Sequence, residues 1–399
     1  MASEKMEGLG RRRSVIREIF EYARVRRAEI GAENVFDFSL GNPSVPAPPE
    51  VGQTLTRLLC ESDPAALHGY TSAQGDAAVR EAIADFIRRT HGARADASLI
   101  YMTVGAAAAL TVSLRALLSD GGGDEVIAFA PYFPEYKVFA EGAGGRLVSV
   151  PCREGDFQID AGRLAAALTE RTRAVIVNSP NNPTGAVLTE ENLQGACAVL
   201  REAEERFGHP IYLIADEPYR ELVYGDVTVP YLPNLYQNTL VCYSFSKSLS
   251  LPGERIGYIA VSPEAAEAEA VYAAVMGAGR ALGYVCAPSL FQQMIPSVLG
   301  KTADLSVYAA NRDRLYTALT AYGYDCVRPD GAFYLFVRAK EDDACAFAER
   351  AKKYELLLVP SDDFGCPGYV RIAYCVQPDM IERALPAFRA LAEEYKTEK

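Results

Sequence analysis

Residues 174–216 read AVIVNSPNNPTGAVLTEENLQGACAVLREAEERFGHPIYLIAD and decide the fold class. The runs Ala174–Asn178 and Ile211–Ala215 are apolar and do not alternate with polar residues, which is typical of strands buried on both faces. Between them, Glu190–Phe207 is long enough for a crossover helix. The segment therefore predicts a strand–helix–strand unit with parallel strands.

The same pattern continues on both sides of this unit. Further strand-like runs lie at Glu125–Ala130, Arg146–Val150, Leu240–Ser244 and Arg255–Val261. Because helical segments separate most of these runs, the sequence predicts an α/β fold. We expect a large domain with a mostly parallel sheet flanked by helices, and we place it at residues 46–303.

The two ends of the chain predict a smaller α+β domain, built from residues 1–45 and 304–399. In the N-terminal segment, Ser14–Ile30 has helical periodicity. The C-terminal part alternates shorter elements. We expect helices at Ala309–Tyr322, Asp343–Lys353 and Ile381–Tyr395, and strands at Ala332–Val337, Leu356–Val359 and Tyr369–Tyr374.

The overall composition excludes several classes of function. The chain has 399 residues and a net charge of −12, which argues against nucleic acid as a main partner. The basic cluster Arg11–Arg13 is interpreted as the solvated start of a helix. Residues 1–10 have no apolar core of a signal peptide, and no apolar run reaches membrane length, so we expect a cytoplasmic protein without a membrane partner.

A metal site is not expected either. The nine cysteines contain no CxxC pair, and the chain has three histidines. Neither a zinc site nor a secreted disulfide framework fits that pattern.

Unusual polar residues follow the predicted strands. Asp216 stands at the end of one, where it must be paired or solvated, or else cap the next helix. Lys247 comes just after another. There its ammonium is either partly desolvated, which makes it a usable nucleophile, or extended into water.

Two loops at strand ends complete the pattern. In Ser179–Gly185, two prolines flank the adjacent amides, which predicts either an ordinary turn or a stiff loop that presents Asn182 as a donor. In Thr103–Ala107, small residues precede a helix, so backbone N–H groups can approach a phosphate, although close helix packing uses the same residues. Ligands bind at such strand ends in open α/β sheets.

Taken together, these features resemble the class I aminotransferases, the aspartate aminotransferase family of fold type I pyridoxal 5′-phosphate (PLP) enzymes. The resemblance covers nearly the whole chain, from Phe36–Pro43 to Tyr369–Ala373. It is carried by the order and spacing of Asn182, Asp216, Tyr219, Lys247, Arg255 and Arg371.

The resemblance implies catalytic and ring-binding roles. Lys247 resembles the lysine that holds PLP as a Schiff base and later moves the substrate's α-proton. Asp216 resembles the residue that pairs with the pyridine nitrogen. Asn182 and Tyr219 resemble the donors to the phenolic oxygen. Phe133 matches the aromatic residue that stacks on the ring, where many relatives have Trp; Tyr132 is the less favoured candidate.

The resemblance also implies seats for the phosphate and the substrate. The phosphate is expected against Gly105, Ala106 and Ala107 with Ser244, Ser246 and Arg255. The loop lacks the hydroxyls that are common in relatives. Tyr70 resembles a tyrosine that reaches the phosphate from the neighbouring subunit, which implies a homodimer. Arg371 resembles the arginine that grips the substrate α-carboxylate, with Gly41 closing over it and Asn182 beside it.

The expected function is therefore a PLP-dependent aminotransferase with small-molecule substrates. Glutamate and 2-oxoglutarate are expected as one pair. Arg280 is interpreted as a helix-surface residue rather than as a second carboxylate-binding arginine, so aspartate specificity is not predicted. A carbon–sulfur β-lyase on the same scaffold is the alternative. A ligand-sensing transcription regulator fits poorly, since only about 40 residues precede the motifs.

Overall fold

The computed structural model describes residues 2–11, 15–121 and 123–397. The chain starts with helix α1 (Glu4–Arg11), followed by α2 (Val15–Ile30). Arg11 is thus the last residue of a helix, so the expectation that it starts one was wrong. Arg12, Arg13 and Ser14, which belong to the same predicted segment, lie outside the described residues.

Within the described residues, seven strands form one sheet in the order β2-β8-β7-β6-β5-β3-β4. Their bounds are β2 Ile100–Thr103, β3 Glu125–Ala130, β4 Arg146–Pro151, β5 Thr172–Asn178, β6 Tyr212–Asp216, β7 Thr239–Ser244 and β8 Gly257–Val261. Strands β4, β3, β5, β6 and β7 are parallel to one another, whereas β8 runs antiparallel to both β7 and β2. The mostly parallel sheet is confirmed.

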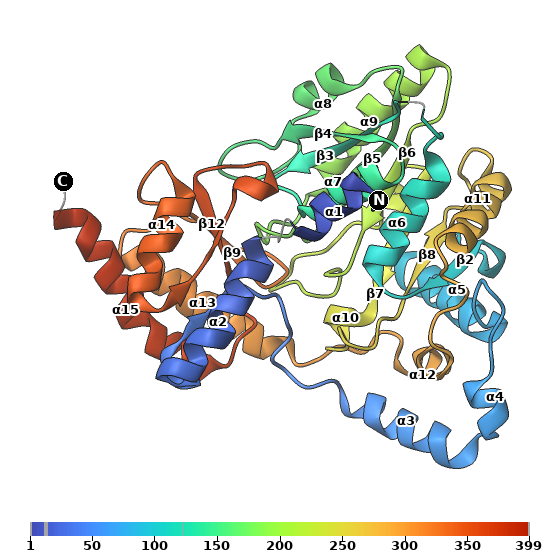
Figure 1. Cartoon of the computed structure of the whole chain (residues 1–399). Coiled ribbons are helices and arrows are strands. Elements are labelled where there is room, and N and C mark those ends of the chain that lie inside the picture. Colours follow the sequence, from blue (N-terminus) through green and yellow to red (C-terminus); the bar gives the residue numbers. More distant parts are fainter. Residues whose placement is uncertain (1, 12–14, 122, 398–399) are drawn as a thin grey trace.

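Helices cover both faces of this sheet (Figure 1). In β5, Val175 and Val177 belong to one buried cluster, while Ala174 and Ile176 belong to another. The first cluster includes residues of α5 (Ala77–His91), α9 (Glu190–Phe207) and α12 (Ser289–Val298), and the second includes residues of α6 (Ala106–Leu117), α7 (Glu135–Gly142) and α11 (Ala268–Ala281). Double-sided burial explains why the central run of β5 does not alternate between apolar and polar residues. The helices α3 (Pro49–Glu61), α4 (Pro64–His68) and α8 (Ala161–Ala167) lie in the same half of the molecule.

The C-terminal part packs beside the sheet with the N-terminal segment against it (Figure 1). Its strands β11 (Val359–Pro360), β12 (Tyr369–Ala373) and β9 (Tyr334–Arg338) are antiparallel, and β1 (Phe36–Asp37) pairs in parallel with β10 (Leu356–Leu357). Helices α13 (Leu305–Ala321), α14 (Ala344–Ala351) and α15 (Pro378–Thr397) complete it. The division at residues 46–303 stays a prediction.

Several predicted boundaries were wrong for local reasons. The helix predicted from Ala309 begins at Leu305, because the Asp304 side chain accepts a hydrogen bond from the Ser306 backbone N–H. Arg255 and Ala332 were assigned to strands, but their φ angles are +51° and +54°, which strands do not contain. The single strand predicted at 356–359 is two short strands in different sheets. The last helix extends beyond both predicted ends.

Candidate active site

One cavity of about 280 Å³ brings most of the predicted site residues together. Residues from the ends of β5, β6 and β7 contribute to it, as expected for an open α/β sheet. Its lining includes the following predicted residues: Gly41, Ala106, Ala107, Phe133, Asn182, Asp216, Tyr219, Ser244, Ser246, Lys247, Arg255 and Arg371.

Lys247 lies in the short helix α10 (Phe245–Ser248), directly after β7. Its Nζ donates a hydrogen bond to the Gly41 carbonyl oxygen at 2.6 Å. Burial lowers the pKa of this amine to about 8, and the nearby charges of Arg255 and Arg371 also lower it. A larger share of the side chain is therefore neutral and nucleophilic near pH 7 than for an exposed lysine.

Asp216 is the last residue of β6, and its side chain is 4% exposed. The Tyr136 hydroxyl donates to Oδ2 at 2.5 Å, whereas Oδ1 is buried with no hydrogen-bond partner among the described residues. Burial raises the pKa of this carboxyl to about 7, although the hydrogen bond from Tyr136 opposes the rise. An unpaired buried carboxylate oxygen is costly, so Oδ1 is suited to accept a hydrogen bond from a cationic N–H group.

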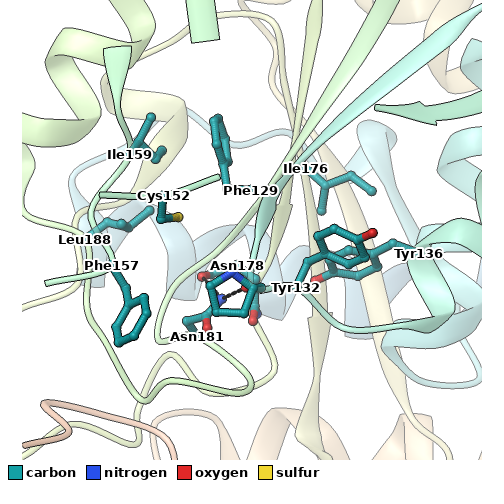
Figure 2. Close-up of a pocket in the computed structure, with 11 residues that line it drawn as sticks. Phe129, Tyr132, Tyr136, Cys152, Phe157, Ile159, Ile176, Asn178, Asn181 and Leu188 are labelled. Atoms are coloured by element: carbon teal, nitrogen blue, oxygen red, sulfur yellow. Dashed lines mark hydrogen bonds between the residues drawn. The ribbon is translucent and has the colours of Figure 1, made fainter. Parts of the chain in front are cut away.

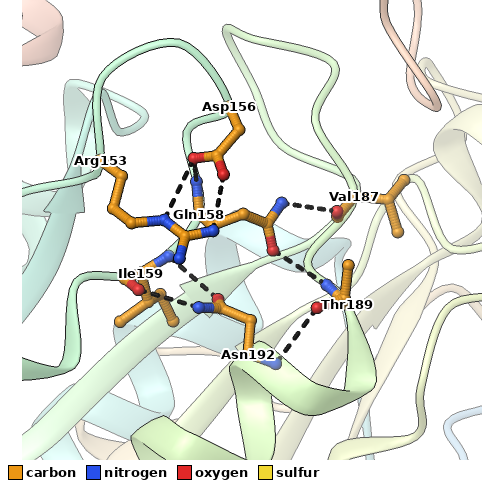
Figure 3. Close-up of polar contacts among 7 residues, drawn as sticks. All are labelled: Arg153, Asp156, Gln158, Ile159, Val187, Thr189 and Asn192. Carbon is orange, nitrogen blue, oxygen red and sulfur yellow. Dashed lines mark hydrogen bonds and ion pairs between the residues drawn. The ribbon is translucent and has the colours of Figure 1, made fainter.

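Hydrogen bonds hold the loop that carries Asn182. Its backbone N–H donates to Asn178 Oδ1 at 2.8 Å, and Asn178 Nδ2 donates to the Asp216 carbonyl at 2.9 Å. At the far end of the loop, the Gln158 amide bonds to the Val187 carbonyl and the Thr189 N–H, each at 3.0 Å (Figure 3). The loop is thus tied to the strand that carries Asp216.

Further polar contacts hold the segments on either side of Gln158. Arg153 pairs with Asp156, and the Asn192 side chain bonds to both backbone groups of Ile159 (Figure 3). These contacts support the hypothesis that the loop presents Asn182 at a defined position.

Arg371 on β12 is 2% exposed and is held on several sides. Its Nη1 donates to Asn182 Oδ1 at 3.0 Å, and its Nη2 donates to the Ser39 carbonyl at 2.6 Å. Its Nε has no partner among the residues described. The guanidinium lies 4.6 Å from the ring centroid of Tyr334. A buried, oriented guanidinium with a vacant donor is suited to bind a carboxylate.

Besides Arg371, the start of α6 offers another site for an anion, called the anion seat below. Ala106 and Ala107 form its first turn, where backbone N–H groups are unpaired within the helix. Arg255 Nη1 donates to Ser246 Oγ at 3.3 Å. Gly105 has φ +88°, and a Cβ there would lie 2.5 Å from Arg255 Nη2. Glycine at this position therefore leaves room for the guanidinium beside the helix start.

The site matches a known family. The family model described as aminotransferase class I and II matches residues 33–388. The chain belongs to this family. Relatives and solved structures that it resembles are named as aminotransferases, and the chain is an enzyme of this kind.

Relatives and solved structures agree over almost the full length. The chain is 30% identical over 393 residues to an aspartate aminotransferase of Bacillus subtilis, covering 94% of this chain and 95% of the relative. A crystal structure of an amino transferase from Eubacterium rectale superposes with a TM-score of 0.97 at 55% identity, with 99% of each chain covered. The aspartate aminotransferase of Thermus thermophilus with maleate gives 0.86 at 28% identity, covering 98% and 100%.

Among the residues of this aminotransferase site that were not predicted, three make hydrogen bonds to predicted ones or to their loop. Tyr136 bonds to Asp216, Asn178 links Asp216 to the Asn182 loop, and the Tyr334 hydroxyl lies 2.9 Å from that of Tyr219. Tyr136 lies three residues after Phe133, and Asn178 is the last residue of β5. Their proximity in sequence to predicted site residues could have marked Tyr136 and Asn178 as candidates. It does not indicate which atoms their side chains contact.

A second cavity of about 20 Å³ borders the aminotransferase site (Figure 2). Asn178 lines both cavities, whereas Tyr132 lines the small one and Phe133 the large one. The small cavity has room for about one water molecule. The placement of the two aromatic residues therefore favours Phe133 as the residue that stacks on a ligand.

Three residues singled out in the sequence, Tyr70, Gly105 and Arg280, do not line the cavity. Tyr70 is 93% exposed and is not part of the cavity lining. Gly105 is likewise outside the lining, but it contacts Arg255 as described above. Arg280 on α11 is exposed and does not line the cavity of this chain.

No helix in the described part of the chain is long and apolar enough to span a membrane.

The lowered pKa of Lys247 predicts how its reactivity depends on pH. In the cofactor-free protein, the rate at which a small neutral amine-reactive reagent modifies Lys247 is expected to rise with pH and level off above about 8. An ordinary lysine would level off above about 10.4. Mass spectrometry of the Lys247 peptide gives the rate. The exposed Lys137 is the internal control, and equal profiles for the two lysines would contradict the prediction.

Proposed function

We propose that this aminotransferase binds PLP through Lys247 and moves an amino group between an L-amino acid and a 2-oxo acid, with glutamate and 2-oxoglutarate as one pair. The observation that carries the proposal is the unpartnered Asp216 Oδ1 in the same cavity as Lys247 and the anion seat. When bound, PLP supplies an aldehyde that condenses with amines and a ring that accepts electrons from the substrate α-carbon.

The donors of the cavity fit each part of PLP. Asp216 would keep the ring nitrogen protonated, because a buried carboxylate stabilises an adjacent cation. Asn182 and Tyr219 would donate to the phenolic oxygen. The phosphate would meet the N-terminus of α6 with Ser244, Ser246 and Arg255, where backbone N–H groups and a guanidinium converge.

The same residues favour transfer of the amino group over loss of the substrate carboxylate. Arg371 would hold the α-carboxylate and so fix which bond at the α-carbon faces Lys247. With its lowered pKa, the neutral Lys247 Nζ would take the proton from the substrate α-carbon as a general base. It would then give the proton to the cofactor carbon that carried the aldehyde. Gly41 would lie against the same carboxylate.

We also propose that the active unit is a homodimer in which Tyr70 reaches the phosphate of the partner's site. An exposed fraction of 93% is unusual for a tyrosine, and contact with a second copy would cover it. A cytoplasmic location is proposed as well, because the nine cysteines, all within the described residues, are free.

The test is to load the purified protein with PLP and add single amino acids while recording the visible spectrum. We expect conversion of the aldehyde form of the cofactor to its amine form, reversed by 2-oxoglutarate. A spectrum that forms with PLP and converts with no amino acid would contradict transamination. Release of pyruvate and ammonia from cystathionine, without an oxo acid, would then favour the β-lyase.

A further inference from the structure

The cavity has an apolar wall that the cofactor and carboxylate seats do not use. Ile16 of α2 and Leu40 form it, beside Phe133, which is assigned to the cofactor ring. Leu40 is 42% exposed and Ile16 is partly exposed. Partly exposed apolar side chains at the edge of a binding cavity favour an apolar ligand, because the ligand removes their surface from water when it binds.

Helix α2 holds Ile16 in place against the C-terminal part of the chain. Ile19 and Ala23 of the same helix are buried and pack in one cluster with Leu357, Val359 and Phe364. One turn further on, the Arg26 guanidinium pairs with Glu355 at 2.5 Å. The position of Ile16 is therefore set by the packing of its helix.

The charges around the cavity disfavour a second carboxylate on the substrate. Among the described residues, its cationic side chains are Lys247, Arg255 and Arg371. Under the proposed function, all three are engaged by the cofactor and the α-carboxylate. A side-chain carboxylate would then lose water without gaining a partner from this chain.

Acidic residues behind the apolar wall act in the same direction. A small cavity of about 20 Å³ shares Ile16 and Phe133 with the main cavity, and its lining also contains Glu135 and Asp363. Neither carboxylate can pair with an anionic substrate side chain. No lysine or arginine lines this small cavity within the described chain.

We propose that the side-chain subsite takes neutral, apolar amino acids, aromatic or branched aliphatic, and that Ile16 determines this specificity. The proposal rests on the proposed function, since it assigns the substrate of that site. Glutamate, proposed above as one donor, also carries a distal carboxylate and is therefore expected to be a poorer donor than phenylalanine or leucine.

The experiment compares phenylalanine, leucine and aspartate as amino donors to the PLP-loaded protein. We expect kcat/KM for phenylalanine and leucine to exceed that for aspartate by about 10- to 100-fold, the value of burying one apolar side chain. Binding of unreactive carboxylates gives an independent readout, in which 3-phenylpropanoate is expected to perturb the cofactor spectrum at lower concentration than maleate.

A charge at position 16 tests the assignment of that residue. Ile16→Arg is expected to reverse the order, with aspartate gaining and phenylalanine losing at least about 10-fold. The matched control is Val25→Arg, which places the same charge on an exposed position of α2 away from the cavity and should leave the preference unchanged. A thermal unfolding midpoint for each variant separates misfolding from altered specificity.

The two proposals fail in different ways. Tighter binding of maleate than of 3-phenylpropanoate, or a preference of the unsubstituted enzyme for aspartate, would overturn the apolar subsite while leaving transamination intact. If no donor converts the cofactor, the proposed function fails, and the carboxylate binding order still decides the nature of the subsite. An unchanged preference in folded Ile16→Arg would remove Ile16 as the determinant.

Discussion

Replacing Lys247 by alanine is expected to lower the rate of transamination by about 10²- to 10⁴-fold, the range that removal of a positioned general base produces. The variant also loses the amine that would hold the cofactor covalently. Fold stability should change little, because the only hydrogen bond recorded for Lys247 Nζ among the described residues is the one to Gly41. Activity should therefore fall without a matching fall in the melting temperature.

Two controls make the Lys247 result specific. Lys137→Ala removes an exposed lysine, 63% of whose side chain is accessible, and should retain full activity. The visible absorption of the PLP-loaded protein should also change, since the cofactor in Lys247→Ala would be bound without its covalent linkage. Normal turnover in the folded variant would contradict the assignment of Lys247 as base and as attachment point.

The large sheet could be predicted because its strands are buried on both faces. Residues 174–177 and 240–243 have no charged side chain and no alternation with polar residues, and the structure puts alternate residues of each run into different cores. The C-terminal part was harder to delimit. There the ends of the elements depend on single interactions, such as the cap from Asp304 and the positive φ of Ala332.

The site shows a similar division. The residues proposed to touch the ligands could be predicted because polar side chains such as Lys247 and Asp216 are unusual beside apolar strands. Residues that orient them were not, because their contacts join distant parts of the chain. Tyr136 bonds to Asp216 across 80 positions and Tyr334 to Tyr219 across 115. No local pattern records such a contact.

Asp216→Asn is the second change with a large expected effect. The amide has nearly the shape of the carboxylate, so the Tyr136 hydroxyl retains an oxygen to which it can donate. What disappears is the negative charge that would hold a proton on the ring nitrogen. Loss of one partner of a buried charge pair costs about 3–5 kcal/mol, so kcat is expected to fall by about 10²- to 5 × 10³-fold.

The pH dependence of cofactor binding gives a readout that does not depend on turnover. Burial raises the pKa of the Asp216 carboxyl to about 7 in the cofactor-free protein. As pH falls through 7, this carboxyl becomes neutral and can no longer stabilise a protonated ring nitrogen, so PLP affinity should decline. In Asp216→Asn the group does not titrate, so the part of the decline that is due to this carboxyl should disappear, while the part due to protonation of Lys247 remains. Fluorescence or absorbance titration with PLP at several pH values measures both proteins.

A control carboxylate separates the charge at Asp216 from the overall charge of the protein. Asp120→Asn removes one negative charge from a side chain that is 85% exposed and pairs with Arg115, and it should leave both kcat and the pH profile of PLP binding unchanged. If Asp216→Asn kept its activity and its pH-dependent affinity, the unpartnered Oδ1 would not be the partner of the ring nitrogen. The cofactor would then have to be oriented by its phosphate seat and Lys247 alone, and the raised pKa of Asp216 would reflect burial without a catalytic role.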